Sequence, residues 1–97
     1  MNLLKETLEV LERNKVSPSD VCFVTDGKSD CGWKEFADNA DFEYDEGYGG
    51  NEINLSLKIV GKDWWLERGE YDGSEWWEFK RRPMASYNKK LPQIKDE

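Results

Sequence analysis

The chain has 97 residues, and its 21 acidic and 14 basic residues give a net charge of −7. A chain of this length forms one domain with a modest core, and it has no apolar run of about 18 residues that could span a membrane. Histidine is absent and only two cysteines are present, so a zinc site, a disulfide framework and histidine-based acid–base catalysis lack their usual side chains.

Residues 2–14 have the apolar periodicity of a helix. The predicted buried stripe consists of Leu3, Leu4, Leu8, Val10 and Leu11, with the glutamates, Glu6 among them, on the other side. The charges of Lys5 and Glu6 come too early for a signal peptide, so we expect a cytoplasmic protein. Pro18 ends this helix and can begin one further turn over residues 17–20.

Residues 21–31 predict a short hairpin, because a β-rich run is followed by Asp26-Gly27, a strong signal for a two-residue type I′ turn. This register places Cys22 opposite Cys31. A disulfide is then geometrically conceivable, but a reducing cytosol favours two buried thiols.

Residues 33–40 predict a short second helix, with Trp33, Phe36, Ala37 and Ala40 on one side at helical spacing.

An acidic, glycine-rich loop is expected over residues 41–52. Its carboxylates match the calcium-binding positions of an EF-hand at Asp41, Glu43, Asp45 and Glu52. However, Glu46 stands where that loop needs glycine, and a strand follows where a helix would be needed. We therefore predict a solvated acidic loop, with no metal site and no cofactor. The alternative is a looser carboxylate site that binds a cation such as calcium.

The next thirty residues predict a three-stranded antiparallel meander with two-residue turns at 61–62 and 72–73. The predicted pairs are Leu57–Leu66, Ile59–Trp64, Leu66–Phe79 and Arg68–Trp77. One face then collects the apolar residues Ile53, Leu55, Leu57, Ile59, Trp64, Leu66, Trp77 and Phe79, which the N-terminal helix is expected to cover. The predicted fold class is α+β, with a short hairpin and a second short helix before the meander, and residues 1–83 form a single domain.

The other face of the meander carries Lys58, Trp65, Glu67, Tyr71, Trp76, Glu78 and Lys80. The register places Trp65 between Lys58 and Lys80, and Trp76 across from Gly69. Tryptophan and tyrosine are enriched at binding hot spots, so this face is a candidate contact surface. The alternative is that this face has no binding role. The second helix or the acidic loop then covers the rings, or the rings only stabilise cross-strand pairs.

Residues 84–97 lack periodicity and predict a disordered basic tail. Residues 1–79 contain 19 acidic and 8 basic residues, a net charge of −11, whereas residues 80–97 have a net charge of +4. Such an acidic body repels nucleic acid and attracts basic surfaces, although the charge can also serve solubility alone.

The segment Asp63-Trp64-Trp65-Leu66-Glu67-Arg68-Gly69-Glu70-Tyr71-Asp72-Gly73-Ser74-Glu75-Trp76-Trp77-Glu78-Phe79 resembles small uncharacterised proteins of bacteriophages and prophages. The resemblance covers the meander alone and implies a bacterial host cell, without an activity. By analogy, small acidic phage proteins are similar to inhibitors of host enzymes, including nucleic-acid mimics that occupy basic clefts.

Together these features predict a non-enzymatic acidic binding protein that inhibits or modulates a nucleic-acid-handling host protein through that partner's basic surface. The candidate binding residues are Trp65, Tyr71, Trp76, Asp41, Glu43, Asp45, Glu46 and Tyr48. No catalytic residue is assigned, because no nucleophile stands beside a base. Direct nucleic-acid binding and membrane association are not expected. The alternative is a self-associating structural protein in which the second sheet face forms a homodimer interface.

Overall fold

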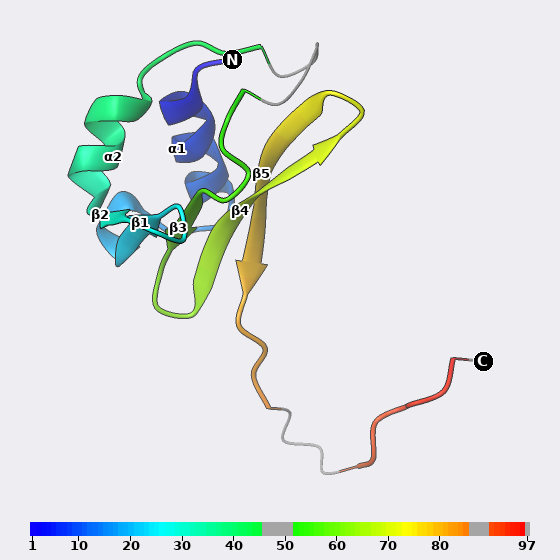
Figure 1. Cartoon of the computed structure of the whole chain (residues 1–97). Helices are drawn as coiled ribbons and strands as arrows, with labels where there is room; N and C mark the ends of the chain where they lie inside the picture. The colour runs from blue at the N-terminus through cyan, green and yellow to red at the C-terminus, as the bar shows by residue number, and fades with distance from the viewer. Residues whose placement is uncertain (46–51, 86–89, 97) are drawn as a thin grey trace.

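The computed structural model describes residues 1–45, 52–85 and 90–96, and in them two α-helices lie against a five-stranded antiparallel sheet (Figure 1). The elements in chain order are α1 (Leu3–Arg13), the 3₁₀ turn η1 (Pro18–Asp20), β1 (Phe23–Thr25), β2 (Asp30–Cys31), α2 (Trp33–Ala40), β3 (Lys58–Val60), β4 (Trp64–Tyr71) and β5 (Ser74–Arg81). The α+β class, α2 and the proline-initiated turn are confirmed.

The sheet is larger than the predicted meander, because the N-terminal hairpin joins it. The strand order is β2-β1-β3-β4-β5, with β1 antiparallel to β3. One continuous row of cross-strand partners therefore runs through the core face: Cys31, Val24, Ile59, Leu66 and Phe79. Ile59 and Leu66 at the centre of this row are fully buried.

The two turns of the β3–β4–β5 unit differ in how well their chemistry predicts register. Asp72 and Gly73 both have positive φ, as a type I′ turn requires, and every predicted β4–β5 pair is correct. The first turn is displaced by one residue, from 61–62 to 62–63, because the Gly61 N–H donates to the Trp64 carbonyl at 2.8 Å and Val60 pairs with Trp65. Ile59 therefore pairs with Leu66, and the register shifts by two residues from the predicted one. A shift of two keeps each side chain on its predicted face.

The predicted strand over residues 53–59 is wrong for most of its length, since β3 contains only Lys58–Val60. Asn54 forms a local turn instead: its carbonyl accepts the Leu57 N–H and its side chain accepts the Ser56 N–H. Ile53 is buried as expected, but Leu55 is 47% exposed.

The predicted two-residue turn at Asp26-Gly27 is also wrong. The Asp26 carboxylate accepts the N–H groups of Lys28 and Ser29 and so stabilises a four-residue loop over residues 26–29. Thr25 therefore pairs with Asp30. Cys31 therefore lies opposite Val24. Both cysteines are free, and Cys22 is exposed, so the expectation of two buried thiols fails at Cys22.

Helix α1 buries a stripe rotated from the predicted one. Its buried residues are Leu3, Glu6, Thr7, Val10 and Leu11, whereas Leu8 is 40% exposed. The rotation follows from polar partners inside the domain, because Glu6 and Thr7 each contact residues of the sheet's core face. Periodicity of apolar residues alone does not detect such partners.

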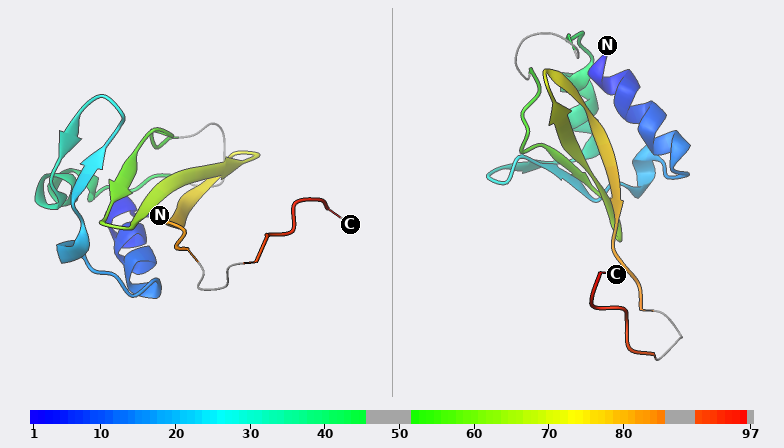
Figure 2. Two further views of the ribbon diagram at one scale, coloured as in Figure 1. Left: turned by 90° about the horizontal axis from the view of Figure 1, so that it is seen from below. Right: turned by 90° about the vertical axis from the view of Figure 1, so that its right-hand side faces the viewer.

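Both helices pack on the core face of the sheet (Figure 2). Helix α1 contacts β5 and helix α2 contacts β1, and the core cluster joins Leu3 and Leu11 to Phe36 and Ala40. As predicted, Trp64 and Trp77 are core residues, and Trp33 is partly buried against the core cluster, with its ring on Phe36. Residues 84–85 and 90–96 are exposed and carry no helix or strand, while 86–89 and 97 lie outside the described residues. No helix in the described ranges is long and apolar enough to cross a membrane.

Candidate functional site

The sheet face away from the helices, here called the open face, carries paired aromatic and acidic side chains. Two rows of cross-strand partners cross it: Phe23, Val60, Trp65 and Lys80 in one, and Thr25, Lys58, Glu67 and Glu78 in the next. Gly69 and Trp76 form the following β4–β5 pair. Two tryptophans therefore flank one pair of carboxylates.

Each tryptophan of the open face donates its indole N–H to a carboxylate on its own strand. Trp65 Nε1 lies 2.7 Å from Glu67 Oε1, and Trp76 Nε1 lies 3.2 Å from Glu78 Oε2. All four side chains are partly buried. The strand alternation explains this geometry, since residues two apart share a face. The indoles fix both carboxylates on the surface.

Glu67 and Glu78 are direct cross-strand partners, an arrangement in which like charges repel. The indole N–H groups offset part of this repulsion, and Lys80 Nζ lies 3.7 Å from Glu78 Oε1. Each carboxylate has about four acceptor sites, so one indole N–H leaves most of them available. The pair therefore forms a small acidic centre between two aromatic rings.

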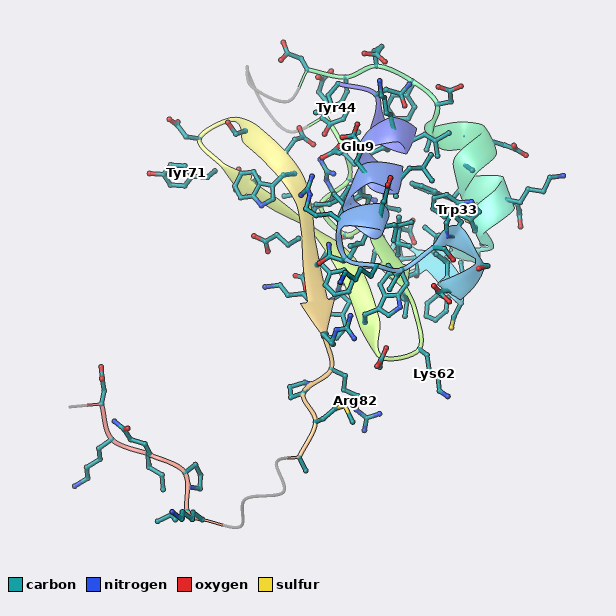
Figure 3. All side chains as sticks on the ribbon, turned by 180° about the vertical axis from the view of Figure 1, so that it is seen from behind. Glu9, Trp33, Tyr44, Lys62, Tyr71 and Arg82 are labelled. Carbon is teal, nitrogen blue, oxygen red and sulfur yellow. The ribbon has the colours of Figure 1, made fainter. Side chains whose placement is uncertain are left out.

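The predicted contacts of the open face are confirmed on β5 and corrected on β3. Trp65 pairs with Lys80, and Trp76 lies over Gly69, where an added Cβ would come within 2.7 Å of Trp76 Nε1. Lys58 pairs with Glu67 instead of Trp65, because the turn lies one residue later than predicted. Tyr71 is 76% exposed and lies at the tip of the β4–β5 hairpin (Figure 3).

The sequence reasoning missed two apolar members of the open face. Phe23, which is 38% exposed, and partly buried Val60 extend the Trp65 row. The pairing of β1 with β3 brings together two residues that lie 37 positions apart in the chain, since 60 − 23 = 37. Alternation within a single strand carries no information about such a partner.

The acidic stretch after α2 lies at the N-terminal end of α1 and is partly engaged. Asp41 Oδ1 accepts a hydrogen bond from Asn2 Nδ2 at 2.9 Å, and Glu43 bridges to Asn2 through the backbone. The Asp45 N–H donates to Glu52. Glu46 and Tyr48 lie outside the described residues. In the part of the chain that the structure describes, no group of three or more acidic, cysteine or histidine side chains could hold a metal ion.

A buried polar cluster ties this stretch to the sheet, and sequence reasoning did not find it. Arg68, Glu75 and Tyr44 are buried, with the Arg68 and Glu75 side chains fully enclosed. Arg68 Nη2 lies 3.1 Å from Glu75 Oε1 and 3.2 Å from the Tyr44 hydroxyl. Arg68 Nη1 lies 3.6 Å from Glu6 Oε2, and the guanidinium stacks 4.7 Å from the Trp77 ring centre.

The cluster also binds backbone groups, while Arg68 Nε and Nη1 make no hydrogen bond. Glu75 accepts the N–H groups of Glu52 and Ile53 at 2.8 and 3.1 Å, which fixes the segment that leads into β3. Tyr44 donates its hydroxyl to Glu6 and so connects the acidic stretch to α1. Trp77 Nε1 donates to Thr7 Oγ1 at 2.8 Å. The only sequence signal was the placement of Arg68 and Glu75 at core-facing positions of the predicted strands.

Burial, together with the hydrogen bond to Glu6, raises the pKa of Tyr44 above its ordinary value of about 10. Above about pH 10 Tyr44 loses its phenolic proton in the unfolded chain but keeps it in the folded chain. The free energy of unfolding should therefore fall as the pH rises. We expect Tyr44→Phe to remove this part of the alkaline slope in urea unfolding between about pH 9 and 11. An alkaline slope in Tyr44→Phe as steep as that of wild type would contradict the assignment.

The described residues provide one partly buried thiol besides these carboxylates. Partial burial and the nearby Glu35 and Asp30 raise the pKa of Cys31, which makes this thiol a poorer nucleophile.

Comparison with protein-family models, curated protein sequences and solved structures found no significant match.

Proposed function

We propose that the chain is a non-catalytic binding protein whose open face takes a cationic side chain of a basic protein partner. The observation that carries the proposal is the opposed pair Glu67–Glu78 between the indoles of Trp65 and Trp76. An arginine or lysine placed there relieves the repulsion between the carboxylates and gains contact with an aromatic ring. Arginine fits better, because its planar fork can reach two carboxylates at once.

The negative charge of residues 1–79 attracts such a partner before the two proteins touch. Residues 1–79 carry a net charge of −11, which attracts a basic surface over roughly one Debye length of about 8–10 Å. The acidic stretch with Asp41, Glu43 and Asp45 adds to this field, whereas the open face provides the short-range contacts. We therefore assign the specific contacts to Trp65, Glu67, Trp76 and Glu78.

The partner class that we propose is a nucleic-acid-handling protein in the cytoplasm of a bacterial host. Its nucleic-acid cleft offers the lysines and arginines that the open face would bind. The resemblance of residues 63–79 to phage and prophage proteins supports the bacterial setting. The chain should then compete with nucleic acid for that cleft, and Glu67→Gln should compete less well.

A titration with a short arginine-rich peptide tests the binding chemistry, followed by tryptophan fluorescence at low salt. We expect Glu67→Gln and Trp65→Ala each to weaken binding about fivefold, the effect of losing about 1 kcal/mol at a partly exposed site. A matched peptide with glutamine in place of arginine should bind much more weakly. Rising salt should weaken the arginine peptide further.

The double variant Asp41→Asn/Glu43→Gln is the matched control, because it removes two exposed charges outside the open face. Its effect should be smaller than that of Glu67→Gln alone. If the control weakened binding more than Glu67→Gln did, the acidic stretch would be the binding site and the open face would not. Unchanged affinity in Glu67→Gln and Trp65→Ala would overturn the proposal as well.

The alternative function is self-association through the open face. The apolar row of Phe23, Val60 and Trp65 favours it, since partly exposed apolar side chains gain free energy when a second copy covers them. Against it, Glu67 and Glu78 of two copies would approach each other. In sedimentation, a face-to-face dimer should dissociate in Trp65→Ala.

A further inference from the structure

Strand β5 forms one edge of the sheet and is eight residues long. The other edge is β2, which has only two residues. A long edge strand presents unpaired backbone N–H and C=O groups that can pair with another strand. Edge strands are commonly protected by proline, by bulges or by short length, and β5 has Pro83 only after its end.

The hairpin register shows which backbone groups of β5 point outward. In a two-residue hairpin the residues that flank the turn, Tyr71 and Ser74, exchange hydrogen bonds, and the bonded pairs then alternate. The Arg82 N–H donates to the Asp63 carbonyl at 2.7 Å, which agrees with this alternation. The outward groups therefore belong to Glu75, Trp77, Phe79 and Arg81. Within the described ranges, no backbone hydrogen bond from another element reaches these four residues.

We propose that β5 pairs antiparallel with β5 of a second copy, with the two-fold axis at Phe79. Phe79 then faces Phe79 of the second copy, and the outward groups of Trp77 and Arg81 meet in the same ladder. On the open face, Glu78 of each copy lies opposite Lys80 of the other. Two opposite-charge pairs and a central aromatic pair stabilise this register.

The neighbouring registers lack this complementarity. An axis at Glu78 places Glu78 opposite itself, and it directs Arg81 toward Glu75, which is fully buried and bound to Arg68. An axis at Trp77 leaves Lys80 opposite Ser74 and Glu78 opposite Trp76, with no charge pair. The axis at Phe79 also ends the ladder before Pro83, which has no N–H to donate.

Such a dimer joins the two sheets into one and places the open faces of both copies side by side. This interface differs from the face-to-face alternative, because Trp65 lies on β4 and takes no part in it. The inference does not depend on the arginine-binding function, since the measurement is made on the chain alone.

Sedimentation equilibrium of the full chain tests the proposal with a charge-complementation design. Wild type should dimerise below about 1 mM, because an interface of this size gives weak affinity. Glu78→Lys and Lys80→Glu should each weaken the dimer about tenfold, since each places like charges opposite one another twice. An equimolar mixture of the two variants should restore the wild-type affinity, because both cross-pairs are then complementary.

Lys58→Glu is the matched control, since it reverses a charge on the same face but on the inner strand β3, two strands away from Glu78; it should dimerise as wild type does. Trp65→Ala should also remain dimeric. Circular dichroism of each variant establishes that it is folded. A monomeric wild type, or dimers of Glu78→Lys and Lys80→Glu as tight as wild type, would overturn edge pairing. A mixture that stays monomeric would overturn the register.

Discussion

Replacing Arg68 with Met should lower the free energy of unfolding by about 3–5 kcal/mol, the cost of leaving buried charges without their partner. Glu75 is fully buried and Glu6 nearly so, and Arg68 is the cation between them. Methionine fills a similar volume but neutralises neither carboxylate. Urea unfolding measures the change, and Arg13→Met at the exposed end of α1 should change the free energy by less than about 0.5 kcal/mol.

A double-mutant cycle with Glu75→Gln separates charge from packing. If the cost arises from an unpaired carboxylate, Arg68→Met/Glu75→Gln should be destabilised by less than the sum of the single variants. Glutamine still accepts a hydrogen bond from the backbone of residues 52–53 through its amide oxygen. Additive losses would mean that the two side chains do not act as a pair.

Replacing Gly61 with Ala should destabilise the fold by about 1–3 kcal/mol, the usual cost of overpacking a core. A Cβ built at Gly61 lies only 2.1 Å from an atom of the Trp64 indole. That ring is buried and stacks on Phe79 at 5.6 Å between ring centres, so it cannot move without disrupting the core. The variant should also shift near-ultraviolet circular dichroism, which reports the packing of tryptophan.

Gly69→Ala is the matched comparison, because its Cβ also meets an indole. The nearest atom there is Trp76 Nε1 at 2.7 Å, but Trp76 is only partly buried on the open face and can turn aside. We expect a smaller loss of stability than in Gly61→Ala, together with weaker arginine-peptide binding if Trp76 moves. Equal destabilisation at both positions would contradict the assignment of Trp64 to the core and Trp76 to the open face.

The face assignments of β4 and β5 were predictable because they depend on alternation and on one turn with strong chemistry. Asp72-Gly73 set the register, and Trp77, Leu66 and Phe79 lie where the pattern placed them. The turn at Gly61 was less predictable, since the approach of Trp64 to a glycine involves a side chain and not a turn motif. The predicted β3–β4 register was wrong by two residues, which changed the β3 partner of Trp65 but left Trp65 on the same face of the sheet.

The candidate site was only partly predictable. Trp65 and Trp76 were identified, but their indole hydrogen bonds to Glu67 and Glu78 depend on side-chain conformations that the sequence does not specify. Tyr71 lies on the predicted face by strand alternation, at the hairpin end of β4. The sequence predicts solvated carboxylates at Asp41 and Glu43, whereas Asn2 donates to the Asp41 carboxylate and the N-terminal ammonium lies 3.5 Å from the Glu43 carboxylate.

The sequence by itself determined the local features of this protein: both helices, the proline-initiated turn, the Asp72-Gly73 hairpin and the two faces of β4 and β5. These features follow from spacing and backbone preferences within a few residues. Only the tertiary structure decided that β1 joins β3, that α1 turns Glu6 inward, and that Tyr44, Arg68 and Glu75 share a buried cluster. Polar residues are buried only where partners from distant segments meet them, and such partners leave no period in the sequence.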